Sequence, residues 1–231
     1  MIWDIDVAKR LPHRERPFDL HFQCRSNAQR LVLFGPSGAG KSQTLKLIAG
    51  LTRPDRGHVR LSGRALFDAA AGIDLSPQSR RLAYVFQDYA LFPHLTVRQN
   101  VAFGLHGGWR NPPRQAAHEA VDHWLQAFDL QALAQHHPHQ LSGGQRQRTA
   151  LARALVAGAQ ALLLDEPFAA LDRASALRLR EELIALQSRL GLPMLLITHD
   201  EDDVRALADE VVHLAAGRVV ASPAAPAAAH G

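Results

Sequence analysis

The run G-P-S-G-A-G-K-S at residues 35–42 constrains this chain more than any other feature. It fits the phosphate-binding loop pattern G-x-x-x-x-G-K-[ST], in which backbone N–H groups at a helix N-terminus surround the phosphates of a nucleotide. Glycines are needed because side chains would block the approach of the anion. Lys41 is expected between the β- and γ-phosphates, and the Ser42 hydroxyl is expected to complete a magnesium shell. The motif therefore predicts binding of ATP or GTP.

Strand and helix patterns alternate around this loop. Strands are predicted at residues 2–7, 18–24, 30–34, 59–61, 82–86, 161–164, 194–198, 210–214 and 218–220, and helices at 42–49, 97–105, 115–128, 144–156, 174–190 and 201–207. Such alternation indicates a parallel sheet with helices on its faces. The pattern turns helical from about Asp88, so we expect an α/β core interrupted by a helical insert.

Composition restricts the class of protein. The chain has 231 residues, 47% of them hydrophobic and 21% charged, which is typical of a globular protein. Its apolar runs are far shorter than the roughly 20 residues that span a bilayer. The single cysteine, Cys24, rules out an internal disulfide and is typical of a reducing compartment. The net charge of +4 comes from scattered arginines, so no nucleic-acid partner is expected.

Two further motifs carry chemistry. Residues 162–166 form an apolar run ending in two acids, of which Asp165 suits magnesium and Glu166 can take a proton from an attacking water. The run S-G-G-Q at residues 142–145 opens a predicted helix and can form a second anion site. Because the first loop already holds the nucleotide, the second site is expected to serve the γ-phosphate bound to another copy. Each motif has a plain alternative when it is taken alone: residues 162–166 as an ordinary strand end, and residues 142–145 as a glycine-rich helix start.

The phosphate loop, the acidic strand end and the L-S-G-G-Q run, in that order, resemble the nucleotide-binding subunit of an ABC transporter over residues 2–220. The resemblance implies an α/β fold: a RecA-like P-loop NTPase core (residues 1–87 and 159–220) with an N-terminal antiparallel β part and an inserted α-helical subdomain (88–158). An Ala/Pro-rich, disordered tail is expected at 221–231.

The same resemblance implies an ATPase that uses ATP and Mg²⁺ and forms a homodimer in its ATP-bound state. Its implied partners are integral-membrane permease subunits and, indirectly, a periplasmic or extracellular binding protein. The chain is then expected at the cytoplasmic face of the membrane.

Functional roles follow from the resemblance residue by residue. Glu166, His199 and Gln87 are expected to be catalytic, with His199 orienting Glu166 and Gln87 relaying closure to the permease. Magnesium is expected at Ser42, Gln87 and Asp165. The residues expected to bind ATP are Gly35, Pro36, Ser37, Gly38, Ala39, Gly40, Lys41, Ser42 and Gln43, with Ser142, Gly143, Gly144, Gln145 and Asp172 acting in trans.

Three features leave alternatives open. The family places an aromatic residue before the second strand to stack on adenine, but residues 11–16 contain none. Phe18 is expected inside the strand, which leaves His13 or an arginine for stacking. Residues 89–94 resemble the permease-docking segment of importers, with Tyr89 and His94 at its ends, although Phe92 could instead pack inside the helical insert. Three histidines within residues 136–139 could attract a metal, but their place is typical of the family's Pro-His-Gln lead-in.

The transported substrate is suggested only by resemblance. Residues 64–87 look most like molybdate importer subunits, whereas residues 91–97 are shared with sulfate, iron and sugar relatives. We therefore expect import of an oxyanion such as molybdate. An importer of another substrate, an efflux pump, and an ATPase acting on nucleic acid are the alternatives. Many relatives carry a C-terminal regulatory β-domain, for which this chain is too short, so regulation by that route is not expected.

Overall fold

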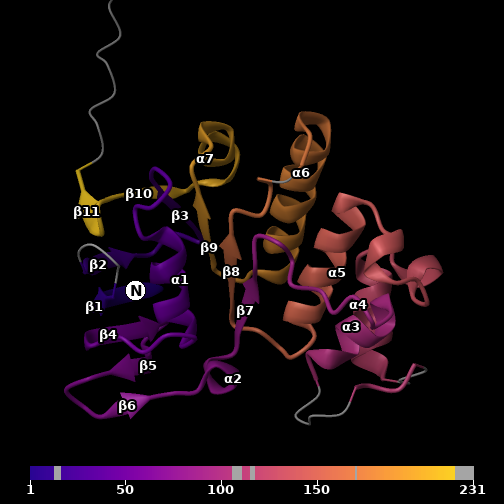
Figure 1. Ribbon diagram of the computed structural model, residues 1–231, viewed down its shortest axis with the longest axis horizontal. Coiled ribbons are helices and arrows are strands. Elements are labelled where there is room, and N and C mark those ends of the chain that lie inside the picture. The colour runs from indigo at the N-terminus through magenta and orange to yellow at the C-terminus, as the bar shows by residue number, and fades with distance from the viewer. Residues whose placement is uncertain (13–16, 106–110, 115–117, 170, 222–231) are drawn as a thin grey trace, which may run out of the picture.

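The computed structural model describes residues 1–12, 17–105, 111–114, 118–169 and 171–221 (Figure 1). Its strands are β1 (Trp3–Leu11), β2 (Phe18–Ser26), β3 (Arg30–Phe34), β4 (Arg56–Leu61), β5 (Arg64–Asp68), β6 (Ile73–Asp74), β7 (Leu82–Val85), β8 (Ala161–Asp165), β9 (Met194–Thr198), β10 (Glu210–Ala215) and β11 (Arg218–Val220). Its α-helices are α1 (Lys41–Ala49), α2 (Pro77–Arg80), α3 (Val97–Phe103), α4 (Glu119–Ala127), α5 (Gly143–Leu155), α6 (Arg173–Leu190) and α7 (Glu201–Leu207).

The strands of the described residues form one sheet in the order β6-β5-β4-β1-β2-β11-β10-β3-β9-β8-β7. Neighbours from β10 to β7 are parallel, and β1 pairs antiparallel with both β2 and β4. The α/β fold with an N-terminal antiparallel part is thereby confirmed.

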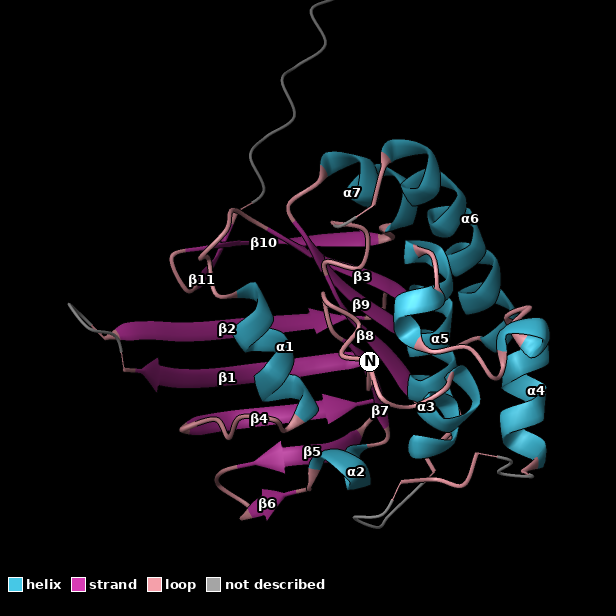
Figure 2. Ribbon diagram, turned by 45° about the vertical axis from the view of Figure 1, so that its right-hand side comes forward, coloured by secondary structure: helices cyan, strands magenta, loops and turns pink. Residues whose placement is uncertain are grey.

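Helices cover both faces of the parallel strands, which explains why β8 and β9 are buried at every position. Alternate residues enter different cores. Leu163 packs with α1 residues such as Leu45, whereas Leu162 packs with α5 and α6 residues such as Leu151 and Leu183. Figure 2 shows α1 on one side of the sheet and α5 and α6 beyond β7 and β8.

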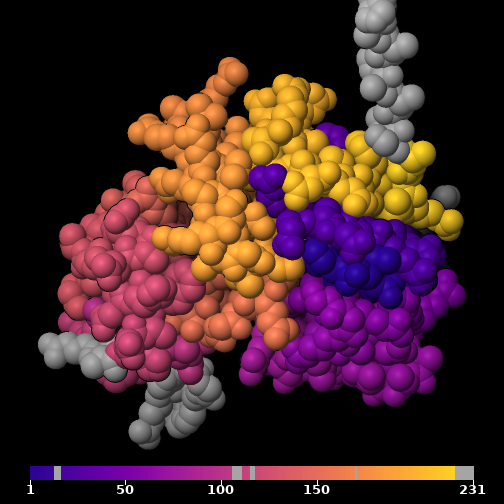
Figure 3. Space-filling view, turned by 180° about the vertical axis from the view of Figure 1, so that it is seen from behind, coloured from indigo at the N-terminus to yellow at the C-terminus, as the bar shows by residue number. Residues whose placement is uncertain are grey.

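The helices α3, α4 and α5 lie in the sequence between the neighbouring strands β7 and β8. Thr96 and Ser142 begin α3 and α5 with capping boxes, in which the side chains of the N-cap and N3 residues satisfy each other's backbone N–H groups. In the space-filling view, this helical part lies on the side opposite the N-terminal strands (Figure 3). The boundaries of the insert at 88 and 158 stay a prediction.

Local patterns missed the segment from Arg64 to Arg80, which holds β5, β6 and α2. A tight turn with positive φ at Ser62 (49°) and Gly63 (80°) joins β4 to β5. These strands are short, and their apolar residues do not alternate clearly. The first strand is also longer than predicted, because its antiparallel pairing with β2 continues to Leu11, opposite Phe18.

Two remaining expectations concern the C-terminal tail and membrane-spanning helices. The tail predicted at 221–231 lies outside the described residues from 222 onward. Among the helices that the structure describes, none combines the length and the apolarity needed to cross a bilayer.

Candidate functional site

Three neighbouring parallel strands bring the candidate residues to one edge of the sheet. In the register, Phe34 of β3 lies beside Thr198 of β9, and Ile197 of β9 lies beside Asp165 of β8. The phosphate loop follows β3, Glu166 follows β8 and His199 follows β9. This is the carboxyl edge of the sheet, where ligands bind in open α/β folds.

The phosphate loop is shaped for an anion. Gly38 and Gly40 adopt positive φ of 78° and 102°. Gly40 is the N-cap residue of α1 and has no side chain, so no side-chain cap binds the first N–H groups of the helix. A Cβ at Gly35 would lie 2.1 Å from the carbonyl oxygen of Leu214. The loop therefore requires its glycines for close backbone packing as well as for its turn.

Lys41 is buried at the start of α1 and folds back over the loop. Its Nζ donates to the carbonyl oxygens of Gly35 at 2.7 Å and Pro36 at 3.0 Å. It also lies 3.5 Å from Oε1 of Glu166. The only cation of the loop thus stands between the loop backbone and the acidic end of β8.

Ser42 and Asp165 form the candidate metal site. The Ser42 Oγ donates to Oδ1 of Asp165 at 3.0 Å, and the Tyr84 hydroxyl donates to Oδ2 at 3.0 Å. Burial raises the pKa of Asp165, while these two hydrogen bonds act in the opposite direction. Gln87 and Ser42 line one pocket at the phosphate loop. A carboxylate, a hydroxyl and an amide are oxygen donors that suit Mg²⁺.

Tyr84 is a site residue that sequence reasoning missed. It lies on β7, whose neighbouring residues Ala83 and Val85 are buried on the opposite face. Burial and the nearby Asp165 raise the pKa of Tyr84, so its hydroxyl stays a donor. A strand with one tyrosine among apolar residues carries no signal of this contact, because the pairing of β7 with β8 is not local.

Glu166 is held between two possible partners in catalysis. Its Oε1 faces Nζ of Lys41, and its Oε2 lies 3.1 Å from Nδ1 of His199. Its φ of 45° is in the left-handed region, which costs a non-glycine residue about 1 kcal/mol or more. The carboxylate is largely buried, whereas half of the His199 side chain is exposed. This arrangement places a base beside the phosphate loop with a histidine that can orient it.

A pocket of about 780 Å³ brings together the phosphate loop, Gln87 and Glu166, whereas Asp165 and His199 are not among its lining residues. Its lining residues are Leu11, Pro12, Phe18, Ser37, Gly38, Gly40, Lys41, Ser42, Gln43, Gln87 and Glu166. Gly35, Pro36 and Ala39 do not line it; the first two bind Lys41 through their carbonyl oxygens, and Ala39 is buried.

Phe18 is the aromatic residue of this pocket. It begins β2, as predicted, and its ring carbons still lie 3.2 and 3.3 Å from the position that a Cβ would take at Gly40. Placement in the strand therefore did not remove Phe18 from the phosphate-loop pocket. The earlier candidates for stacking, His13 and its arginine neighbours, lie outside the described residues.

The residues predicted to act in trans lie in a separate hollow. Ser142, Gly143, Gly144 and Asp172 line a hollow of about 420 Å³ that shares no residue with the phosphate-loop pocket. Gln145 caps Ser142, accepting its N–H at 2.9 Å. Asp172 caps α6, and its hydrogen bonds from Ser175 lower its pKa. Ala170, beside this hollow in the sequence, lies outside the described residues.

The segment 89–94 is held by hydrogen bonds from α5 and is exposed in part. Arg153 donates to the carbonyl oxygens of Tyr89 at 2.8 Å and Ala90 at 2.7 Å. Tyr89 is buried, whereas Pro93 and His94 are exposed. Phe92 is half-buried, with its ring centroid 4.4 Å from that of Phe103. Phe92 thus packs on the helical part and still reaches the surface.

The histidines before the S-G-G-Q run lie at a short 3₁₀ turn, Pro138–Gln140. The N–H of His137 donates to Oε1 of Gln140 at 2.7 Å, and the His137 ring stacks on that of His139 with centroids 5.8 Å apart. Within the described residues, no group of three or more His, Cys, Asp and Glu side chains is placed to hold a metal.

Comparison with known proteins gives consistent matches. The family model described as "ABC transporter" matches residues 18–169. A molybdenum import ATP-binding protein, ModC of Rhodospirillum rubrum, is 41% identical over 219 residues, which are 95% of this chain and 57% of that protein. A sulfate/thiosulfate import ATP-binding protein, CysA 2 of Chromobacterium violaceum, is 48% identical over 191 residues, which are 82% and 49% of the two chains. This chain therefore spans about half the length of these curated relatives.

A solved structure matches the whole fold. The ATP-binding cassette MJ0796, solved as a dimer in a post-hydrolysis state with ADP and Pi, superimposes with a TM-score of 0.72 at 27% identity. The match covers 95% of this chain and 96% of that one.

Proposed function

The chain belongs to the ABC transporter family, and on that premise we propose that it binds and hydrolyses ATP to power an importer from the cytoplasmic face of a membrane. One observation carries this proposal: the Glu166 carboxylate lies between Lys41 and His199, beside the Ser42–Asp165 pair. A nucleophile-activating base, a cation for phosphates and a set of metal donors thus meet at one edge of the sheet.

The chemistry is phosphoryl transfer to water, which depends on positioning and charge neutralisation more than on covalent catalysis. The loop N–H groups and Lys41 bind the phosphates, and Lys41 exchanges the carbonyl oxygens of Gly35 and Pro36 for phosphate oxygens. Ser42, Asp165 and Gln87 would hold a magnesium ion, which would supply positive charge to the phosphates. Glu166 accepts a proton from the attacking water, and His199 keeps Glu166 oriented toward it.

The active form in this proposal is a homodimer. A single chain has two separate hollows, one at the phosphate loop and one at Ser142 and Asp172. In a head-to-tail dimer, each triphosphate is bound by Lys41 of one chain and by the Ser142–Gln145 turn of the other. Loss of the γ-phosphate removes this bridge and opens the dimer. A relative that is solved as a dimer with bound ADP and Pi supports dimerisation.

The opening and closing of the dimer would drive a permease on separate chains. Residues 89–94 are the proposed docking segment, with the exposed Pro93 and His94 and the half-buried Phe92 as its anchors. Gln87 lies two residues before this segment and lines the nucleotide pocket, so it can relay the state of the nucleotide.

The proposed cargo is an oxyanion, with molybdate first, because a relative named for molybdenum import matches 95% of the chain. Sulfate is the second candidate, since a sulfate/thiosulfate relative is 48% identical over 191 residues. Two strains decide between them, one lacking the ATPase of its molybdate importer and one lacking the ATPase of its sulfate importer. Each strain expresses this chain, and its uptake of the labelled anion is measured. Restored uptake of neither anion would contradict the oxyanion assignment.

The variant Glu166→Gln tests the ATPase itself. It should leave ATP affinity within a few-fold, nearly abolish hydrolysis and accumulate a dimer with ATP and Mg²⁺ in size-exclusion chromatography. Glu181→Gln, at an exposed position of α6, is the matched control and should hydrolyse ATP normally. A Glu166→Gln chain that stays monomeric at saturating ATP would count against the proposed dimer. A Glu166→Gln chain that hydrolyses ATP normally would count against Glu166 as the general base.

A further inference from the structure

A buried ion-pair network lies directly behind the Glu166–His199 pair. Its centre is Arg180 of α6, only 7% exposed, together with Asp203 of α7, 3% exposed. The Nε of Arg180 donates to Oδ1 of Asp203 at 2.6 Å. Both charges are withdrawn from water, and burial raises the pKa of Asp203 against the hydrogen bonds that stabilise its charged form. Such a pair is costly to keep and tolerates little change of geometry.

The network reaches His199 from both sides along the chain. Thr198 donates through Oγ1 to Oδ2 of Asp203 at 2.6 Å, and the N–H of Asp200 donates to that same Oγ1 at 3.0 Å. Arg180 also donates through Nη2 to Oδ2 of Asp200 at 3.2 Å. The residues before and after His199 are therefore tied to one guanidinium. The half-exposed imidazole itself needs such support, because water surrounds much of it.

The same guanidinium contacts the segment that carries Glu166. The Cζ of Arg180 lies 5.5 Å from the ring centroid of Phe168, which is 4% exposed and lies two residues after Glu166. A pocket of about 430 Å³ is lined by Glu166, Phe168 and His199 together with this network. A planar group is suited to this place, because it can bind two carboxylates and stack on a ring at once, which a lysine cannot do.

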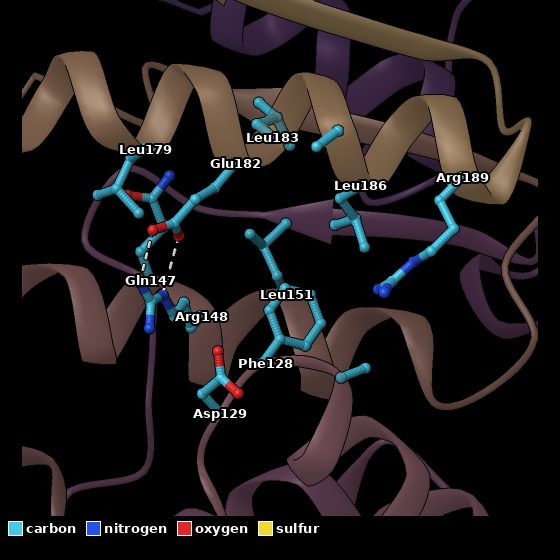
Figure 4. A pocket seen from close by; sticks show the side chains of 12 residues that line it. Phe128, Asp129, Gln147, Arg148, Leu151, Leu179, Glu182, Leu183, Leu186 and Arg189 are labelled. Atoms are coloured by element: carbon cyan, nitrogen blue, oxygen red, sulfur yellow. Dashed lines mark hydrogen bonds and ion pairs between the residues drawn. The ribbon is translucent and has the colours of Figure 1, made fainter.

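Helix α6 connects this network with the second hollow. Asp172 caps the start of α6, and Arg148 of α5 pairs with Glu182 of α6 at 2.9 and 2.5 Å. Figure 4 shows this pair at one end of an apolar pocket of about 320 Å³ between the two helices, with Leu151 and Leu183 on its walls. Through α6, a displacement of α5 or of Asp172 can therefore reach Arg180.

We propose that Arg180 is a positioning residue for hydrolysis: it holds His199 against Glu166 and couples both to the position of α6. The proposal rests on the proposed function, since it gives a role to residues around the hydrolytic site. Arg180 does not line the phosphate-loop pocket; it acts through His199.

A double-mutant cycle tests this role. Arg180→Met should lower kcat at least tenfold and change KM for ATP by less than about twofold, because the phosphate-loop pocket does not contain Arg180. In a His199→Ala chain, whose slow hydrolysis is followed by single turnover, Arg180→Met should lower the rate by less than twofold. Glu181→Gln, at an exposed position of the same helix, is the control and should leave kcat unchanged in both backgrounds.

Two milder variants keep the test valid if Arg180→Met fails to fold. Arg180→Lys retains the charge without the planar fork, and Asp203→Asn is nearly isosteric; each should lower kcat several-fold with KM unchanged, again only when His199 is present. An equal loss with and without His199, or an unchanged kcat in all three variants, would overturn the positioning role. A wild-type chain without ATPase activity would instead overturn the proposed function.

Discussion

Removing one hydroxyl, in Tyr84→Phe, isolates the support of the candidate metal site. Among the described residues, the side chains that donate to the Asp165 carboxylate are those of Tyr84 and Ser42. Burial already raises the pKa of Asp165 above its ordinary value. Because a donor favours the charged form, losing it raises the pKa of Asp165 further and frees the carboxylate to rotate.

The size of the effect follows from this contact. A hydrogen bond to a charged group contributes about 1.5–3 kcal/mol, which corresponds to roughly 10- to 150-fold in an equilibrium constant. Removing a partner of a metal ligand typically lowers metal affinity by about 10–100-fold. We therefore expect the magnesium concentration for half-maximal ATPase activity to rise by about 10–100-fold. The deficit should widen as the pH falls, since the protonated carboxyl is a poor ligand, and narrow as the pH rises.

The assay is steady-state ATP hydrolysis against free Mg²⁺ at several pH values. Tyr89→Phe is the matched control, because the Tyr89 hydroxyl is buried without a hydrogen-bond partner in the described part of the chain. It should leave the magnesium dependence unchanged. An unaltered dependence in Tyr84→Phe, or an equal shift in both variants, would refute the argument that Tyr84 supports Asp165.

Three further changes probe the loop, the helix behind it and the cysteine. Lys41→Ala should weaken ATP binding by about 10–100-fold, as one charge-assisted contact is lost; unchanged affinity in a fluorescent-nucleotide titration would contradict this role. Arg80, fully buried, donates to the carbonyl oxygens of Leu47 and Ile48 at the end of α1, so Arg80→Met should lower the free energy of unfolding by about 3–5 kcal/mol and Tm by about 6–20 °C. A Tm within 2 °C of wild type in thermal denaturation would show that these contacts contribute little. Burial raises the pKa of Cys24 to about 12, so its thiolate, which is the reactive form, is scarce at pH 8. Alkylation of the folded chain should therefore be about a thousandfold slower than that of the unfolded chain. Folded and unfolded rates within tenfold of each other would contradict the burial of this thiol.

Local patterns were reliable where a segment carries its own start, stop and periodicity. The helix after the phosphate loop, α1, ends at Gly50, whose φ of 78° needs a glycine, and α5 begins after Ser142 with its capping box. The continuous apolar runs of β8 and β9 could be read because both faces of these strands are buried. The hairpin of β5 and β6 was missed because its short strands carry no such periodicity.

The contacts that complete the site depend on distant pairing. Tyr84 meets Asp165 across 81 positions of sequence, and Ser42 meets it across 123. Phe18 reaches the pocket because β2 pairs with β1 up to Leu11 and because its ring packs beside Gly40. Each of these contacts requires the order of strands, which no local pattern contains.

By itself, the sequence determined the residue types that phosphate and magnesium chemistry require, and the family that uses them in this order. Backbone N–H groups, a lysine, a hydroxyl and two acids must be present for that chemistry whatever the surrounding fold. Only the tertiary structure decided which side chains support them, placing Tyr84 behind Asp165 and Arg180 behind His199. The physical reason is that support comes from packing and hydrogen bonds between elements far apart in the chain, and those arise only when the sheet is assembled.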